Sequence, residues 1–136
     1  MDEVRVVLAD DELFVGQSPT GRALVLDVNR QRDSAPGPMH LLLIALGACT
    51  ASDVESILKK KRQKITHYEV RVSATRRESY PRIWENIMVR HILRGPNLSE
   101  KAVRDAVHLS ATKYCSVSAM LREATTVTMT YEIERE

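Results

Sequence analysis

Cysteine is scarce in this chain: Cys49 and Cys115 are the only two among 136 residues. They lie far apart, so no Cys-x-x-Cys motif exists and thioredoxin-like exchange is disfavoured. Neither cysteine has a second ligand at zinc-finger spacing and the four histidines are scattered, so we predict no metal site. The two thiols are therefore expected to be either inert packing groups or the two halves of one redox site.

The chain also lacks an export signal, a marked charge excess and a long apolar run. Acidic residues stand at positions 2 and 3, where a signal peptide has basic ones, so we expect a reducing, cytoplasmic location. The net charge of +2 argues against a nucleic-acid partner, and the basic run 59–64 is better explained as the end of a helix. The longest apolar run, 39–51, is too short to span a bilayer, so no membrane association is predicted.

No internal repeat is present, and the length fits one domain over residues 1–136. Alternating apolar residues and turn signals predict strands, whereas apolar residues three and four apart predict helices. In chain order the sequence predicts three strands, a long helix, two strands, two helical segments and a last strand, over residues 4–9, 13–18, 22–28, 38–61, 66–77, 82–95, 100–114, 116–121 and 125–134. This order is typical of an α+β fold.

The predicted long helix is apolar on nearly every face in its first half. Such a helix must be covered all round, and one small sheet covers only one of its sides. We therefore predict a homodimer with this helix near its centre.

The local sequence ranks the two thiols by expected acidity. Cys115 stands at a predicted helix start, which favours the thiolate, and Ser118 completes a Cys-x-x-Ser pattern with it. Cys49 lies inside the most apolar helix, where burial raises a thiol pKa unless the fold brings a cation to it. The residues alone therefore favour Cys115 as the more acidic thiol and leave the inert interpretation open.

Four stretches together resemble the OsmC/Ohr family of thiol-dependent peroxidases. They are "GACTA" in a long apolar helix opened by Gly37-Pro38, "TKYCSVSAML" at 112–121, "YPRIWENIMVRHILRG" at 80–95, and "TVTMTYEI" at 126–133. The resemblance covers essentially the whole chain and is closest to the small OsmC-like branch. It implies an intertwined homodimer with an antiparallel-rich sheet, central cysteine-bearing helices and active sites at the subunit interface.

The same resemblance implies roles for the thiols. Cys49 would attack an organic hydroperoxide, Cys115 would resolve the resulting sulfenic acid as a disulfide, and an external dithiol would reduce that disulfide. No metal or organic cofactor is implied.

The chain departs from the family pattern at the start of the long helix. Typical members carry a glutamate there that orients an arginine, whereas this chain has Met39, followed by His40. We assign Arg30 as the activating cation, with Arg32, Arg22 and Arg82 as alternatives. The alternative function is a non-catalytic relative that binds a small apolar ligand or senses oxidants.

Overall fold

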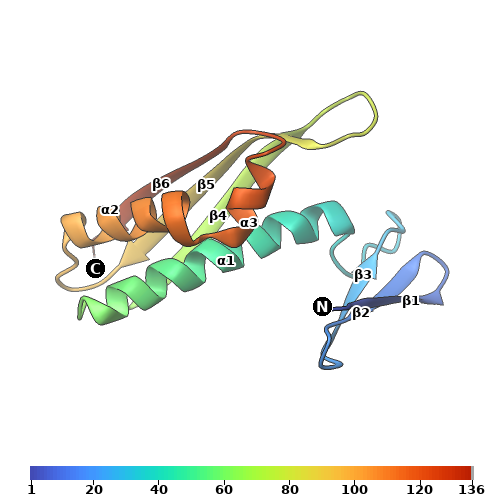
Figure 1. Ribbon diagram of the computed structural model, residues 1–136, viewed down its shortest axis with the longest axis horizontal. Helices are drawn as coiled ribbons and strands as arrows, with labels where there is room; N and C mark the ends of the chain where they lie inside the picture. The colour runs from blue at the N-terminus through green and yellow to red at the C-terminus, as the bar shows by residue number, and fades with distance from the viewer. Residues whose placement is uncertain (136) are drawn as a thin grey trace. The chain divides into compact units, whose positions relative to one another are not determined.

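The computed structural model describes residues 1–135, which fall into two compact units that divide between Leu42 and Leu43. Strands occur in runs that helices separate, as Figure 1 shows, and the predicted α+β class is confirmed. All nine predicted elements are present, and most of their ends differ from the predictions by one to a few residues. The exception is the helix predicted over 100–114, whose last five residues form a π-helix.

The N-terminal unit contains one antiparallel sheet in the order β1–β2–β3. Its strands are β1 (Arg5–Asp10), β2 (Leu13–Gln17) and β3 (Ala23–Asp27). A hydrogen-bonded turn joins the last two: the Gly21 N–H donates to the Ser18 carbonyl at 2.9 Å, and Gly21 adopts φ = 88°, which glycine tolerates best. Every residue of β1 is exposed, so this sheet has almost no core of its own.

The long helix α1 (Pro38–Lys60) begins at a proline, whose missing N–H would have no partner in the first turn. Its buried residues recur every three or four positions and so form one face: Leu43, Leu46, Gly47, Thr50, Val54 and Leu58. Gly47 lets the helix approach β4 closely, because a Cβ there would meet the Val72 side chain at 3.3 Å. In length and apolarity α1 is also the one helix in residues 1–135 that would suffice to cross a bilayer, a test that core helices of soluble proteins also pass.

The C-terminal unit is built on a second sheet, ordered β4–β5–β6. The strands are β4 (His67–Arg76), β5 (Trp84–Arg94) and β6 (Val127–Glu134); β4 and β5 are antiparallel, and β5 and β6 are parallel. Residues of α1, α2 and β5 form the buried core on one face of this sheet: Val54, Leu58, Leu93, Ala102, Val103, Ala106 and Val107. The opposite face carries ion pairs such as Arg90–Glu132 at 3.2 Å and Arg94–Glu134 at 3.2 Å.

Helix α2 (Glu100–Leu109) begins where the sequence predicts, with Ser99 as its N-cap accepting the Ala102 N–H at 3.2 Å. The predicted single helix to residue 114 is not continuous, however. From Ser110 to Tyr114 the chain forms a π-helix, η1, which ends when the Cys115 N–H donates to the Ser110 carbonyl at 2.9 Å. Cys115 then caps the short helix α3 (Ser116–Leu121), so the predicted restart at this cysteine is confirmed.

Candidate active site

The structure brings together two cysteines that lie on different helices of the C-terminal unit, α1 and α3. Cys49 projects from the middle of α1 and is partly exposed, whereas Cys115 lies at the N-cap of α3 and is 2% exposed. Cys49 lies close enough to Cys115 for its side chain to be among the groups that raise the pKa of the Cys115 thiol. Both cysteines are reduced in the structure.

The acidity expected for Cys115 from its place at a helix start is contradicted. Burial has the largest effect on the Cys115 thiol and raises its pKa, and the neighbouring Cys49 raises this pKa further. The hydroxyl and backbone N–H of Ser118 lower this pKa, but they do not outweigh burial. Ser118 of the Cys-x-x-Ser pattern thus favours the thiolate, while α3, with only six residues, does not compensate for the loss of water around the sulfur.

A buried polar network surrounds the helix turn that follows Cys49. The Thr50 hydroxyl lies 2.7 Å from the Ser110 hydroxyl and 3.4 Å from His91 Nε2, and Ser110 donates to Asp53 Oδ2 at 2.9 Å. On the other side of the imidazole, the Tyr68 hydroxyl lies 2.7 Å from His91 Nδ1. Burial lowers the pKa of His91 to about 4, so the imidazole is neutral near pH 7.

Among the arginines that the sequence nominates, Arg32 is bound to residues of the N-terminal sheet and its first turn. Its guanidinium donates to both carboxylate oxygens of Asp27, at 2.9 and 3.0 Å, and to the Asp11 carbonyl at 2.7 Å. Ser34 donates a further bond to Asp27 at 2.6 Å. These bonds, with Arg32 the largest contributor, hold the pKa of Asp27 well below its usual range.

Arg30 lies in the same loop of the N-terminal unit and is exposed, so its predicted role toward Cys49 stays a prediction. Of the alternatives, Arg82 donates its Nε to the Arg77 carbonyl at 3.1 Å, and Arg22 lines an apolar cavity of the N-terminal unit. Within residues 1–135, no group of three or more histidine, cysteine or acidic residues is arranged to hold a metal ion.

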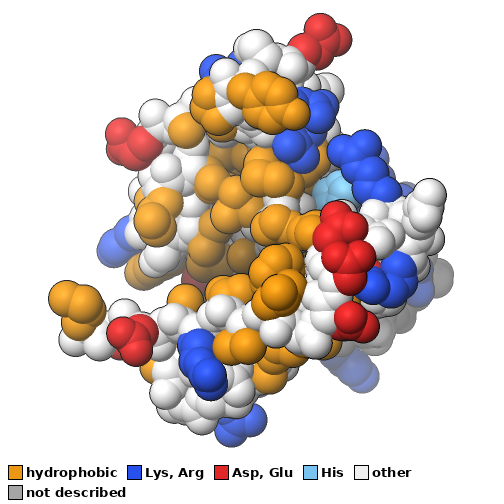
Figure 2. Space-filling view, turned by 90° about the vertical axis from the view of Figure 1, so that its right-hand side faces the viewer, with side chains coloured by type: hydrophobic (Ala, Val, Ile, Leu, Met, Phe, Trp, Pro, Cys, Tyr) orange, Lys and Arg blue, Asp and Glu red, His pale blue; other side chains and the backbone are white. Residues whose placement is uncertain are grey.

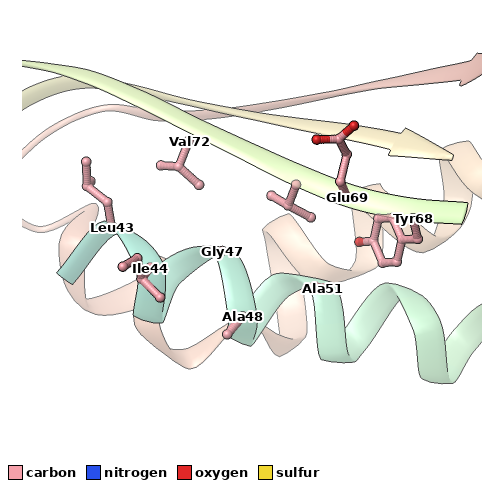
Figure 3. Close-up of a pocket in the computed structure, with 9 residues that line it drawn as sticks. Leu43, Ile44, Gly47, Ala48, Ala51, Tyr68, Glu69 and Val72 are labelled. Atoms are coloured by element: carbon pink, nitrogen blue, oxygen red, sulfur yellow. The ribbon is translucent and has the colours of Figure 1, made fainter. Parts of the chain in front are cut away.

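An apolar cavity of about 390 Å³ lies between α1 and β4 in the C-terminal unit. Figure 3 shows that Tyr68 and Val72 point from β4 toward the helix, while the Glu69 carboxylate points away from it. The helix contributes small and aliphatic side chains, and Ala48, the residue before Cys49, is one of them. A second cavity of about 420 Å³ on another face of α1 has Asp53, Lys60 and Tyr114 among its lining residues.

The sequence analysis missed Thr50, His91, Asp53 and Ser110 as parts of the site region. The available signal was a polar residue at a core position: Thr50 follows Gly47 by three residues and precedes Val54 by four. A hydroxyl on the buried face of a helix requires a buried partner. Its partner could not be identified because Ser110 is 60 residues away.

The family model for "OsmC-like protein" matches residues 31–130 of the chain. The protein YhfA of Escherichia coli (strain K12) is 42% identical over 131 residues, which cover 96% of this chain and 97% of that protein. A crystal structure of a hypothetical protein from Aquifex aeolicus VF5 is 33% identical, with a TM-score of 0.88 over 100% of this chain and 98% of that one. An organic hydroperoxide resistance protein from Elizabethkingia anophelis shares the fold at 14% identity, with a TM-score of 0.67 over 98% and 96% of the two chains.

Proposed function

This chain belongs to the OsmC-like protein family, and from that premise we propose that it is a thiol-dependent peroxidase that reduces organic hydroperoxides through Cys49 and Cys115. The observation that carries the proposal is the proximity of the two cysteines: Cys49 influences the pKa of Cys115 although 65 intervening residues separate them along the chain. The name of the Elizabethkingia protein, which shares the fold, points to the same class of substrate.

The proposed cycle uses only thiol chemistry. The Cys49 thiolate attacks one oxygen of the hydroperoxide, the O–O bond breaks, and an alcohol leaves after taking up a proton, so that Cys49 becomes a sulfenic acid. The Cys115 sulfur then attacks the sulfenic sulfur, forming a disulfide and releasing water. An external dithiol reduces this disulfide by two thiol–disulfide exchanges, which returns both cysteines to thiols. The scheme requires no metal or organic cofactor.

We assign the first attack to Cys49 because of the different surroundings of the two sulfur atoms. Cys49 is partly exposed and so can meet a substrate, whereas Cys115 is almost fully buried and has a raised pKa. A nucleophilic thiol must be both accessible and ionised. We propose Arg30 as the cation that promotes this ionisation, since Arg32 is bound to Asp27. Replacing Arg30 by alanine should slow the attack on peroxide, whereas Arg30→Lys should retain part of the rate.

The cavity between α1 and β4 supports an organic rather than a small inorganic peroxide. Its walls are mostly aliphatic, and burying apolar substrate surface contributes about 25 cal/mol per Å². We therefore expect cumene hydroperoxide to be turned over faster than hydrogen peroxide. Faster turnover of hydrogen peroxide would rule out this substrate preference.

The test of the function is a single-turnover thiol count. Reduced protein receives one equivalent of cumene hydroperoxide, and free thiols are counted after denaturation at several times. The wild type should lose both thiols rapidly. Cys49→Ser should keep its one remaining thiol, that of Cys115, over the same time. Cys115→Ser should instead accumulate a sulfenic acid on Cys49 that a 1,3-dione traps. Thiol loss no faster than that of free cysteine in the wild type would refute the peroxidase.

A second candidate function is binding of a small apolar ligand without turnover. It is favoured by the same cavity together with Met39, which cannot supply the carboxylate of typical family members. Under this alternative, an apolar fluorescent probe should bind to reduced protein in which thiol loss is slow. Loss of probe binding in Ala48→Leu, which fills the helix side of the cavity, would locate the binding there.

We propose further that the protein is a homodimer. Many large apolar side chains are exposed in the single chain, as the orange surface in Figure 2 illustrates, including Val4, Val6, Leu8, Leu24, Leu42 and Ile44. A three-stranded sheet with no core of its own needs further packing to be stable. Sedimentation should give twice the mass of one chain, and Ile44→Lys should shift the protein toward monomer. A wild-type monomer at micromolar concentration would refute this.

The required reductant suggests where the protein works. Disulfide reduction by a dithiol needs a compartment in which thiols are kept reduced, so we propose a cytoplasmic location. Cell fractionation with an antibody to the chain tests this directly; recovery in an oxidising compartment would contradict it.

A further inference from the structure

Through its hydrogen bonds, Ser110 joins the two segments that carry the cysteines. Thr50 directly follows Cys49 on α1, and its hydroxyl lies 2.7 Å from that of Ser110. Ser110 is the first residue of η1, and its carbonyl accepts the N–H of Cys115 at 2.9 Å. Ser110 therefore bonds to α1 through its side chain and to Cys115 through its backbone.

The donors and acceptors of the network indicate the direction of its main bonds. Ser110 donates its hydroxyl proton to Asp53, so Ser110 in turn accepts the proton of Thr50. His91 consequently donates to Thr50 through Nε2–H and accepts the Tyr68 hydroxyl proton at Nδ1. The Thr50 hydroxyl also lies 3.4 Å from Met129 Sδ, a weak acceptor that competes with Ser110 for its single proton.

Burial makes this arrangement rigid. Thr50, Ser110 and His91 are each 0% exposed, so water does not compete for their hydrogen bonds. Every buried side-chain nitrogen and oxygen atom within residues 1–135 has a partner, and breaking one of these bonds would leave two orphaned groups in the core. The π-helix η1 belongs to this arrangement because Ser110 is its first residue. Helices of this type are rare and are concentrated at functional sites.

We propose that Thr50 and Ser110 are positioning residues that hold the sulfur atoms of Cys49 and Cys115 at the separation needed for disulfide formation. The inference rests on the proposed function and names the residues that govern its second step. In that step the Cys115 sulfur bonds to the sulfenic sulfur of Cys49, the S–O bond breaks, and the hydroxide leaves as water with the thiol proton of Cys115. The rate of such a step depends on how well the two reacting atoms are held together.

The test compares two substitutions of one side chain. Thr50→Val keeps the shape and removes the hydroxyl, and Thr50→Ser keeps the hydroxyl and removes a methyl group. We expect Thr50→Val to slow disulfide formation after oxidation about tenfold, the factor that corresponds to one buried hydrogen bond, and Thr50→Ser to restore most of the rate. The first step, peroxide attack measured in a Cys115→Ser background, should change less than about twofold, because positioning acts on the second step.

Thr112→Val is the matched control. Thr112 belongs to the same π-helix, but its hydroxyl donates to the His108 carbonyl at 2.8 Å and makes no bond to α1. This variant should disturb the stability of η1 and leave the rate of disulfide formation near that of the wild type. Ser110→Ala, which removes the other hydroxyl of the pair, is the second test variant and should behave like Thr50→Val.

A second readout does not require peroxide. The equilibrium between the reduced protein and its disulfide in dithiothreitol buffers measures the effective concentration of one thiol at the other. Thr50→Val should shift this equilibrium about tenfold toward the thiols, in proportion to its kinetic effect. If the wild type fails to react with peroxide but this shift is present, positioning holds and the peroxidase proposal falls. The positioning role would be overturned if both Thr50→Val and Ser110→Ala left the rate and the equilibrium of disulfide formation unchanged.

Discussion

The buried imidazole of His91 makes stability depend on pH. His91 is 0% exposed, its Nδ1 faces the Tyr68 hydroxyl at 2.7 Å, and burial lowers its pKa from the ordinary 6.5 to about 4. In the unfolded chain the same imidazole titrates near 6.5. Between pH 6.5 and 4 the unfolded state therefore binds more protons than the folded state, so stability falls as the pH falls through this window.

The size of the effect follows from the shift. Lowering the pKa of His91 from 6.5 to about 4 corresponds to about 3 kcal/mol of unfolding free energy, present above pH 6.5 and mostly lost by about pH 4. For a domain whose whole stability is of the order of 5–15 kcal/mol, such a loss is easily measured. Protonation would also break the hydrogen-bonded chain, because a doubly protonated imidazole no longer accepts the Tyr68 proton.

The assay is urea unfolding at pH 7 and at pH 4 for the wild type and for His91→Gln. Carboxylates titrate in both proteins, so the difference between their two pH dependences isolates His91. We expect the wild type to lose about 3 kcal/mol more than the variant on acidification. An NMR titration of the imidazole provides the direct control, with a midpoint near 4. Parallel loss of stability in the two proteins, or a midpoint near 6.5, would refute a dry, neutral His91.

Three further predictions concern the thiols, a helix cap and the core. Because burial raises the pKa of Cys115, iodoacetamide should label Cys49 in Cys115→Ser faster at pH 7.5 than it labels Cys115 in Cys49→Ser; comparable rates would contradict the buried position of Cys115. Ser99→Ala removes the cap of α2 and should cost about 1 kcal/mol in urea unfolding, whereas an unchanged midpoint would show that the cap contributes nothing. Leu58→Ala empties a position that is 0% exposed and should cost about 3 kcal/mol by the same measurement; a loss below about 1 kcal/mol would place Leu58 outside the core.

The elements of this fold were largely predictable because their signals are local. Alternation through Tyr68, Val70 and Val72 marks β4, Ser99 marks the start of α2, and Pro38 marks the start of α1. Each signal lies within a few residues of the feature that it predicts, so one sequence is enough to read it.

The site was predictable only in part, because its partners meet across long sequence separations. Cys49 and Cys115 could be nominated as a pair by resemblance, but their proximity, like the hydrogen bond of Thr50 with Ser110, depends on how α1 packs against η1. The acidity of Cys115 was misjudged for the same reason: the helix start is visible in the sequence, whereas the burial that outweighs it is not.

The loop that carries Arg30 shows how the chain orders this segment without an acid at position 39. The carboxylate that fixes the loop belongs instead to Asp27, at the end of β3, which accepts hydrogen bonds from Arg32, from Ser34 and from the Asn29 N–H at 2.9 Å. A guanidinium bound to both oxygens of one carboxylate keeps its charge, which the carboxylate offsets, and is held in place, so Arg32 orders the loop and is not available as a mobile cation. Met39 therefore need not mark a failed site: the loop has its own acid, and the arginine that this acid does not bind is the one we assign to the chemistry.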